Sequence, residues 1–462
     1  MPVIWTKHIT FASQKQKTEM KTAFCSILLA LAMNVQAQQT WTAQQCMHYA
    51  VEHNHQIKQT EWQLDNYKAS KLATIGNFLP EVGAAIGAQY NFGRAIDPET
   101  NGYTDVSTFY NGYQVSASLP LFDGFSRLNA LKAAQASVLM GQSALRQQQN
   151  QTALNVLQAF VNVVYYDGLV KMAKEKVEET TLLLKQVQVL EEVGRKSAAD
   201  VAQVESQKAE ADYELTRQQN LLASALLELK KEMAYPIADS IRYETPALNA
   251  TSSHVGNEVF PQGELNVATL GNHPELQASL FQMQASKHEW RQARAALLPA
   301  LSLSAGLSTT YFHTLHLNAS QSFHNQLKNN MGEYVGATLS IPLFDRLQTT
   351  THIRRAKNNY RMAREAYEQK QLELEKLSCE AWQDWQGYLK RTVQMEKKVA
   401  ADSIAYQLTR RQFEEGLSTA IDLHTTSSQL LNSKATLLQC QLMAMVKEQL
   451  VRYYNGQTIW TE

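Results

Sequence analysis

The chain has 462 residues, more than one hydrophobic core usually covers, so several domains or an elongated, repeated architecture is expected. Lysine plus arginine and aspartate plus glutamate both number 43, and only 19% of residues are charged, so no net field draws the chain toward nucleic acid. Hydrophobic residues make up 44% of the sequence, yet beyond the N-terminal region no uninterrupted apolar run approaches the roughly 18 residues of a membrane-spanning helix. These numbers exclude a helical membrane transporter and disfavour electrostatic binding of nucleic acid.

The first 37 residues have the pattern of a targeting segment. Met20 and Lys21 open a short basic region, an apolar stretch covers 23–33, and small residues that a signal peptidase accepts occupy 35–37. Residues 1–37 are therefore interpreted as a signal peptide, whose true start is either Met1 or Met20.

The remaining chain is a tandem duplication with an offset of about 220 residues. Matching landmarks occur in the same order in both halves: 77–80 with 296–299, 119–123 with 341–345, and 191–200 with 414–422. This predicts a first repeat at 38–235, a connector rich in Pro, Ser, Asn and Gly at 236–264, a second repeat at 265–455 and a tail at 456–462. Each repeat is expected to contain a helix, a pair of strands, a long helix and another helix.

Four short segments alternate apolar and polar residues with the period of two that is typical of strands. They cover 81–92 and 111–119 in the first repeat, and 300–311 and 333–341 in the second. A soluble antiparallel sheet alternates in this way, but each segment is also long enough to cross a bilayer as a tilted strand. Their apolar register is interpreted as free of charged residues, and the connecting loops, 93–110 and 312–331, are interpreted as long and polar.

Four strands are too few to close a barrel, and an open edge in lipid would leave backbone groups unpaired. If the strands lie in a membrane, several copies must therefore share one wall. Two copies give eight strands and a barrel filled by side chains, whereas three give twelve strands and leave room for a pore. The predicted fold is mainly α, with long coiled-coil helices and a transmembrane β-barrel portion formed by a trimer.

Long proline-free segments rich in good helix formers flank the strands. From Phe125 to Leu190 such a segment would form about 100 Å of helix. Apolar residues at alternating spacings of three and four predict lengthwise packing in the manner of a coiled coil, with an ordinary buried helix face as the alternative. These residues are Val201, Val204, Ala211, Leu215, Leu222, Ala225 and Leu229 in the first repeat, and Leu431, Ala435, Leu438, Leu442 and Met445 in the second.

Prolines mark the change from helix to strand. Because proline ends helices and favours extended backbone before it, all four junctions are expected at Pro80, Pro120, Pro299 and Pro342.

Two tight helical hairpins are predicted at the landmarks GRKSAAD and GLSTAID. Gly194 and Gly416 can each end a helix in the left-handed conformation, and the Ser or Thr three residues later can cap the next helix. Asp200 and Asp422 stand three residues after those caps, so their structural interpretation is a capping box.

Cysteine and histidine patterns indicate no metal or disulfide framework. Beyond the signal peptide there are three cysteines, Cys46, Cys379 and Cys440, an odd number without CxxC spacing. A single disulfide bond from Cys440 to either of the other two stays open as an alternative. The histidine pairs 53/55 and 313/316 lack a carboxylate or cysteine to complete a metal site. No catalytic or nucleotide-binding string occurs in suitable context, so no catalytic, cofactor or metal site and no enzyme activity are expected.

Taken in order, these features resemble the TolC family of outer-membrane efflux proteins. The resemblance rests on the duplicated element order, the LP and PLFD turns at the strand ends, and the pattern RxFExGLxTxxD at 411–422. It implies a homotrimer with a twelve-stranded barrel in the outer membrane and an α-helical tunnel through the periplasm. It further implies passive conduction as the exit channel of a tripartite efflux or type I secretion system. The partners implied are a periplasmic adaptor (membrane fusion) protein and, through it, an inner-membrane pump of the RND or ABC type.

The resemblance also assigns roles to residues of the hairpins. It implies that Asp422, with Asp200 as a second candidate, lines the periplasmic entrance, where a trimer would form an anionic ring; Thr425 stands where a second acidic residue occurs in the family. The adaptor is expected to contact Gly194, Arg195, Gly416, Leu417 and Ser418. The alternative to an exit channel is a secreted coiled-coil scaffold or adhesin with a small soluble sheet.

Overall fold

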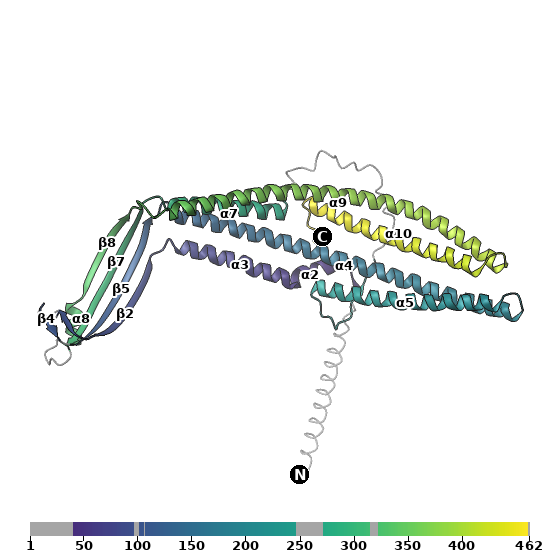
Figure 1. The fold of residues 1–462 in the computed structure, drawn as a ribbon, viewed down its shortest axis with the longest axis horizontal. Coiled ribbons are helices and arrows are strands. Elements are labelled where there is room, and N and C mark those ends of the chain that lie inside the picture. Colours follow the sequence, from purple (N-terminus) through teal and green to yellow (C-terminus); the bar gives the residue numbers. More distant parts are fainter. Residues whose placement is uncertain (1–39, 97–100, 106, 246–270, 315–321, 461–462) are drawn as a thin grey trace, which may run out of the picture. The chain divides into compact units, whose positions relative to one another are not determined.

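The computed structural model describes residues 40–96, 101–105, 107–245, 271–314 and 322–460 (Figure 1). The predicted signal peptide at 1–37 lies outside these residues, as do most of the connector and parts of both loops between strands. The chain divides into two compact units. One contains the described residues 40–50 and 156–245, and the other contains 51–155 and 271–460.

The helices repeat with the offset seen in the sequence. Helices α4 (Ser126–Glu192) and α9 (Gln348–Glu414) each have 67 residues, about 100 Å at 1.5 Å per residue, and both ends are displaced by 222 positions. Shorter helices precede them: α2 (Ala43–His53) and α3 (His55–Gly76) before α4, and α7 (Pro274–Ala295) before α9. Helices α5 (Ala198–Met233) and α10 (Ala420–Tyr454) follow them. The prediction of a mainly helical chain with a few strands is confirmed.

In the first unit a two-stranded pair, a cluster of aromatic rings and the buried face of α5 provide the packing. A short parallel pair joins β1 (Thr40–Trp41) to β6 (Arg242–Tyr243). Beside it the Trp41 ring meets Tyr49 and Tyr235 edge-on, at centroid distances of 5.3 and 5.8 Å. Along α5 the buried residues include Val204, Ala211, Ala225 and Leu229, all from the seam predicted there.

A four-stranded antiparallel sheet lies in the second unit (Figure 1). Its order is β2 (Glu81–Asn91), β5 (Thr108–Phe122), β7 (Ala300–Thr314) and β8 (Gly332–Ser340), so the first and second repeats contribute neighbouring hairpins. The loops predicted to be long and polar contain elements of their own. A hairpin of β3 (Arg94–Ile96) and β4 (Tyr103–Asp105) lies in the first, and helix α8 (Phe323–Asn329) in the second.

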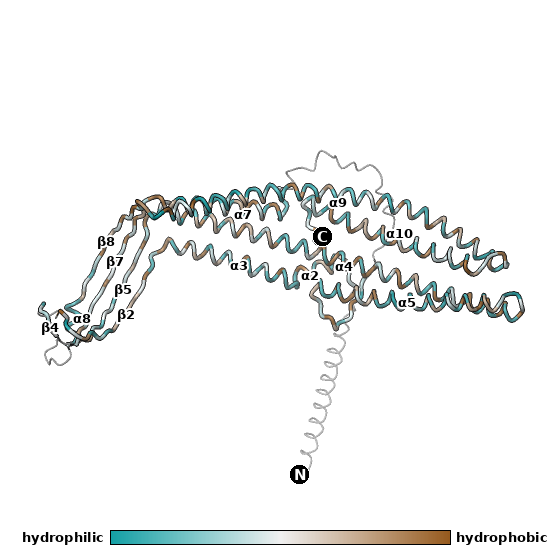
Figure 2. The backbone as a smooth tube through the Cα atoms, in the orientation of Figure 1, coloured by the Kyte–Doolittle hydropathy of each residue, from teal (hydrophilic) through white to brown (hydrophobic). Residues whose placement is uncertain are grey.

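The strand register gathers the apolar residues on one face of the sheet. Paired residues of antiparallel strands share a face, and one such row runs Val82, Ala117, Ala305, Val335 across the four strands. The next row over, on the opposite face, runs Glu81, Ser118, Ser304, Gly336. Figure 2 shows hydrophobic and hydrophilic stretches alternating along the strands.

The apolar register is not free of charge, contrary to the sequence interpretation. Glu333 pairs with Leu307, which follows Ala305 on the apolar face, so a carboxylate stands in that register. It lies in the second residue of β8, where the strand has just begun, and a charge at a strand end can reach water.

Pro120 is not at a junction, which corrects one of the four proline predictions. Strand β5 continues to Phe122, and its pairing with β7 shifts between Pro120 and Phe122. A bulge is one of the few places where a sheet accepts a residue without an N–H, so the strand bends there and does not end. Pro80 and Pro299 directly precede β2 and β7, as expected, and Pro342 follows the end of β8.

The seam of α10 differs from the predicted one. Of the five residues expected there, Leu442 alone is buried; the buried row is Leu423, Ser427, Leu430, Ser433, Cys440 and Ala444. Its spacings are four, three, three, seven and four, which keep it on one side of the helix, but the row is displaced by one position or more. Small residues let α10 lie close to α9, whereas a pattern based on large apolar residues selects the neighbouring stripe.

By length and composition alone, α4 contains a window apolar enough to cross a membrane, half of which is buried inside the protein. A core helix passes the same test. The burial of Phe160, Val163 and Val164 in this helix shows that part of its apolar surface is occupied by packing.

Candidate pore, entrance and docking residues

The sheet has two edges without a partner strand in the described part of the chain. Strands β2 and β8 each pair on one side only, with β5 and β7 respectively. Val82, Ile86 and Val335 on the apolar face are 67%, 75% and 79% exposed. A row of unpaired backbone groups beside exposed apolar side chains is a surface that natural proteins cover.

One stretch of edge is covered by a helix. Strand β7 extends past the start of β8, and there α8 takes the place of a strand. The Gln326 side chain accepts a hydrogen bond from the Phe312 N–H at 2.9 Å and donates one to the Phe312 carbonyl at 3.0 Å. Asn330 adds a hydrogen bond to the Thr310 carbonyl at 2.8 Å. This cap could not be predicted from the sequence, because nothing in a polar loop marks a glutamine whose side chain pairs with a strand as a neighbouring backbone would.

The second helical hairpin has the predicted construction. Gly416 adopts a φ of 79°, which favours glycine, and the Leu417 N–H donates to the Gln412 carbonyl at 2.7 Å to finish α9. Thr419 is the N-cap of α10, and its hydroxyl accepts a hydrogen bond from the Asp422 N–H at 3.2 Å.

The Asp422 carboxylate closes a capping box. Its Oδ2 accepts hydrogen bonds from the Thr419 hydroxyl at 2.6 Å, the Thr419 N–H at 3.1 Å and the Ser418 hydroxyl at 3.3 Å. The bonds from Thr419, followed by that from Ser418, lower the pKa of this carboxyl group. The capping box expected for Asp422 is therefore present, and the side chain stays exposed and ionised at neutral pH. The Thr425 hydroxyl donates a hydrogen bond to the Ile421 carbonyl at 2.8 Å and adds no charge beside Asp422.

The first hairpin repeats this construction in the first unit. Gly194 has a φ of 73°, and the Arg195 N–H donates to the Leu190 carbonyl at 2.8 Å. Ser197 caps α5, with Asp200 Oδ2 accepting from its N–H at 3.0 Å and its hydroxyl at 2.8 Å. These bonds, the backbone one first, lower the pKa of Asp200.

Both turns expose apolar side chains beside polar backbone. Leu417 is 76% and Ile421 62% exposed in the second hairpin, and Val193 is 64% exposed in the first. Gly194 and Gly416 leave open space around their Cα atoms, because a methyl group added there would meet no atom within 4 Å. Such surfaces can receive another apolar helix end.

A polar network that the sequence did not reveal joins α9 to α10. Asp402 accepts hydrogen bonds from Lys398 at 2.6 Å, from Gln429 at 3.1 Å and from the Ser433 hydroxyl. The bond from Lys398, followed by that from Ser433, lowers the pKa of Asp402. Beside the network is an open cavity of about 480 Å³, lined by Lys398, His424 and hydroxyl or amide residues of α10. The sequence feature that could have pointed to it is the high content of Ser, Thr, Asn and Gln between 425 and 436.

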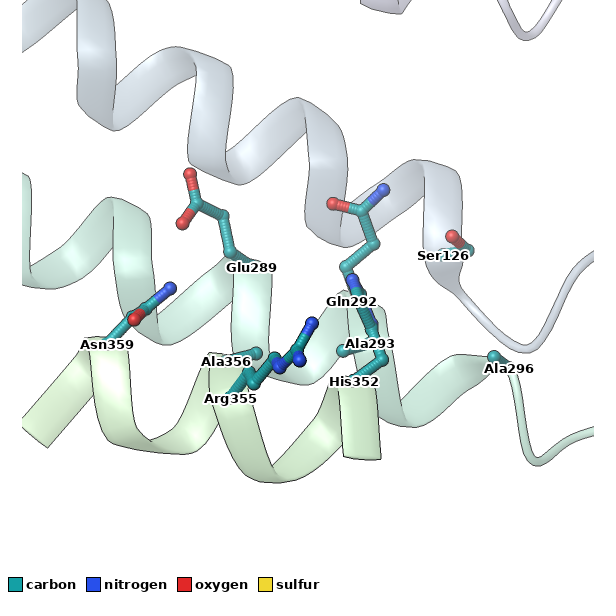
Figure 3. A pocket seen from close by; sticks show the side chains of 9 residues that line it. All are labelled: Ser126, Glu289, Gln292, Ala293, Ala296, His352, Arg355, Ala356 and Asn359. Carbon is teal, nitrogen blue, oxygen red and sulfur yellow. The ribbon is translucent and has the colours of Figure 1, made fainter. Parts of the chain in front are cut away.

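A second cavity, of about 580 Å³, lies where α7 and α9 approach the start of α4 (Figure 3). Glu289 and Gln292 extend from α7 toward α4, and His352, Arg355 and Asn359 come from α9. Its mixed lining is suited to water and small polar solutes, and it contains no arrangement for chemistry.

The cysteines and histidines form no site in the described residues. Cys46, Cys379 and Cys440 are free thiols, and no three His, Cys, Asp or Glu side chains gather there as a metal site would require. His316 lies outside the described residues.

The described residues define a class of protein that is mainly helical, with duplicated long helices and a four-stranded sheet that exposes an apolar face. The family model described as "Outer membrane efflux protein" matches residues 47–234 and 265–452, one match in each repeat. The chain therefore belongs to the outer membrane efflux protein family, that of the TolC-like outer-membrane factors, and its location is the cell outer membrane.

Relatives support the same assignment. The chain is 22% identical over 363 residues to outer membrane efflux protein BepC of Brucella suis biovar 1, covering 77% of this chain and 73% of that protein. It is 23% identical over 378 residues to outer membrane protein TolC of Escherichia coli K12, covering 80% and 73%. The family and these relatives are channel proteins and not enzymes.

Solved structures share the fold. CusC superimposes with a TM-score of 0.78 at 16% identity, covering 91% of this chain and 92% of that one. VceC of Vibrio cholerae gives a TM-score of 0.77 at 15% identity, covering 90% and 96%. At these identities the likeness supports the fold alone.

Proposed function

We propose that three copies of this chain form the exit channel of a tripartite efflux or type I secretion system. The subunits would share a twelve-stranded barrel in the outer membrane and extend their helices as a tunnel into the periplasm. Solutes would pass without chemistry or nucleotide hydrolysis in this protein, and the energy would come from an inner-membrane pump of the RND or ABC type.

The observation that carries this proposal is the incomplete sheet. Its apolar face is exposed over all four strands, and its outer strands β2 and β8 have free edges in the described chain. Lipid can cover the apolar face, and the free edge of β2 in one copy can pair with the free edge of β8 in the next. Three copies leave a lumen lined by the opposite face, whose rows carry Ser, Gly and Thr.

The entrance is proposed at the second hairpin. Only one oxygen of Asp422 is used by the capping box, so the ionised group can also act on passing ions. Three such carboxylates around an axis would favour cations. Asp200 occupies the equivalent place in the first hairpin and is the second candidate.

Docking to a periplasmic adaptor is proposed at the turns of both hairpins. Gly194, Arg195, Gly416, Leu417 and Ser418 are the candidate contacts. The open space at both glycines and the exposed Leu417 support this choice, because a partner's helical hairpin can approach the backbone there.

Cross-linking across the two free edges tests the assembly. Cysteines are placed on β2 at Ala84 and on β8 at Val335, in a chain whose exposed Cys379 is replaced by serine. A short thiol cross-linker applied to membranes is expected to give dimers and trimers only when both positions carry cysteine. The matched control keeps Ala84→Cys and places the second cysteine at Ala117, inside the sheet.

The outcome that contradicts the proposal is equally definite. A protein that remains monomeric, dissolves without detergent and gives no cross-link would instead be the secreted scaffold with a small soluble sheet. A trimer that requires detergent and dissociates only on heating supports the channel.

A further inference from the structure

Cations accumulate on the helices next to the sheet, although the whole chain is neutral. Segments 287–296 and 346–364, which lead into β7 and follow β8, contain nine Lys or Arg residues and one acidic residue. Figure 2 shows the part of α9 near the strands as predominantly hydrophilic. A local excess of this size in a chain with 43 charges of each sign calls for a negative partner.

Six of these cations share one face, named here the basic face. It consists of Arg291 and Arg294 on α7, and Arg354, Lys357, Arg361 and Arg364 on α9. Spacings of three, four and three along α9 keep its four members on one stripe. All six side chains are exposed.

Two aromatic rings form the centre of the basic face. Trp290 of α7 and Tyr360 of α9 stack at a centroid distance of 5.9 Å with planes only 8° apart. The Arg294 guanidinium lies 5.7 Å and the Lys357 ammonium 5.8 Å from the Trp290 ring centroid. These contacts bring cations of both helices together, so the face is one surface.

Little within the chain neutralises this surface. Arg291, Arg354 and Arg361 have no ion-pair partner in the described residues, whereas Arg364 pairs with Glu368 at 2.9 Å. The one acidic residue of the two segments, Glu289, lines the cavity of Figure 3, which no member of the basic face lines.

The basic face begins at the level where the strands end. Arg294 is next to the last residue of α7, and Arg354 lies six residues, about 9 Å, into α9. A headgroup layer is about 5 to 8 Å thick, and charges act over about 8 Å more at physiological salt. Side chains of tryptophan, tyrosine, lysine and arginine are those found at the boundary between membrane and water.

We propose that the basic face binds the phosphate groups of anionic phospholipids in the leaflet next to the helix ends of the sheet. This rests on the proposed function, which places the apolar face of the sheet in lipid and that leaflet toward the periplasm. Phosphates would lie between the arginines, and the aromatic pair would lie at the glycerol level. The ligand chemistry is that of a phosphodiester carried by a membrane.

The full chain is reconstituted into vesicles of phosphatidylethanolamine with one quarter phosphatidylglycerol, or with one quarter phosphatidylcholine in its place. Mild detergent then releases the protein, and native mass spectrometry counts the lipids that stay bound. The expected result is preferential retention of phosphatidylglycerol. Because each cation near a charged membrane contributes about a fivefold effect, Arg291→Gln, Arg354→Gln and Arg361→Gln together should reduce retention tenfold or more.

A matched variant separates this effect from a general loss of charge. Lys390→Gln, Lys397→Gln and Lys434→Gln remove the same charge from exposed positions of α9 and α10 far from the strands, and should leave retention unchanged. Raising salt from about 0.1 to about 0.5 M should release phosphatidylglycerol from the unaltered protein, which tests the inference even if the triple variant folds poorly.

Three outcomes overturn the inference. Equal retention of both lipids would do so, as would an unchanged preference in the basic-face variant. The third is a variant that alters ion selectivity of the channel while it keeps its lipids, because the face would then line the tunnel. A chain that fails to enter vesicles refutes the proposed function itself, whereas insertion without lipid preference refutes only this inference.

Discussion

Protonation of His273 should destabilise the protein in mild acid. Its ring is fully buried at the start of α7, with Tyr453 at 4.7 Å and Tyr454 at 5.9 Å between ring centroids. Neither ring nitrogen has a hydrogen-bond partner among the described residues. Burial, followed by the nearby Lys370 ammonium, lowers the pKa of His273 to about 4.

The magnitude follows from the two pKa values. An unfolded histidine titrates at about 6.5, so below that pH the unfolded chain binds a proton that the folded chain refuses. The stability that neutral His273 contributes is complete above pH 6.5 and falls as the pH approaches 4. At pH 4.5 the loss is about 2.5 kcal/mol per chain.

Denaturant unfolding in detergent at pH 7.5 and 4.5 measures this loss. His273→Gln cannot titrate, so the unaltered protein should lose about 2.5 kcal/mol more than the variant between the two pH values. Lys370, which acts on the ring, and its ion-pair partner Glu275 remain in both proteins, so their contributions cancel. His352→Gln, at an exposed position, should behave like the unaltered chain. Equal pH dependence of the unaltered protein and His273→Gln would refute the reasoning.

Three further predictions concern the hairpins and the junctions. Asp422→Asn should reduce cation selectivity in single-channel recordings, and unchanged conductance and selectivity would leave Asp422 with its capping role alone. Asp402→Asn should increase amide hydrogen exchange where α10 meets α9 at pH 7. Because the pKa of Asp402 is lowered, its ionised contacts are complete above the usual aspartate value of about 4 and are lost only as the pH falls through the lowered value, so the difference from the variant should shrink only in stronger acid. Gly124→Ala should lower the thermal midpoint more than Gly194→Ala: both glycines have positive φ, but a methyl group at 124 would lie 2.7 Å from the Ala295 carbonyl oxygen, whereas one at 194 meets nothing within 4 Å. A larger effect at Gly194 would contradict this.

Periodicity and duplication were sufficient to predict the long helices and the four strands of the sheet, but not the short elements β1, β3, β4, β6 and α8. The offset of 222 between Gly194 and Gly416 is also the offset between both ends of α4 and α9, because a long amphipathic helix begins and ends where local caps allow. The strands followed from alternation alone. Their ends did not, since Pro120 is tolerated at a bulge, and β7 extends to Thr314 by pairing with β5.

What the sequence could not give is the contact between distant side chains. Gln326 caps Phe312 and Ser433 meets Asp402 only because the fold brings them together, and neither residue type signals its partner. The stripe of α10 that faces α9 was misassigned for a related reason. Close packing against a neighbour selected serine, cysteine and alanine, whereas periodicity weighs leucine and methionine most heavily.

The two hairpins share one geometry but differ in the chemistry of their seams, and this difference bears on the proposed entrance. Both capping boxes are complete, and both turns place a glycine at positive φ. Both seams bury apolar residues, Val204 and Leu229 on α5 and Leu423 and Leu430 on α10. The polar residues that α5 buries are the amides Gln207 and Gln218, whereas α10 meets α9 through Ser433 and the ionised Asp402. Separating apolar side chains exposes them to water at full cost, while hydrogen-bonded groups exchange one partner for another with a small net change. The second hairpin can therefore loosen more readily than the first, which supports locating the entrance of the proposed channel at Asp422.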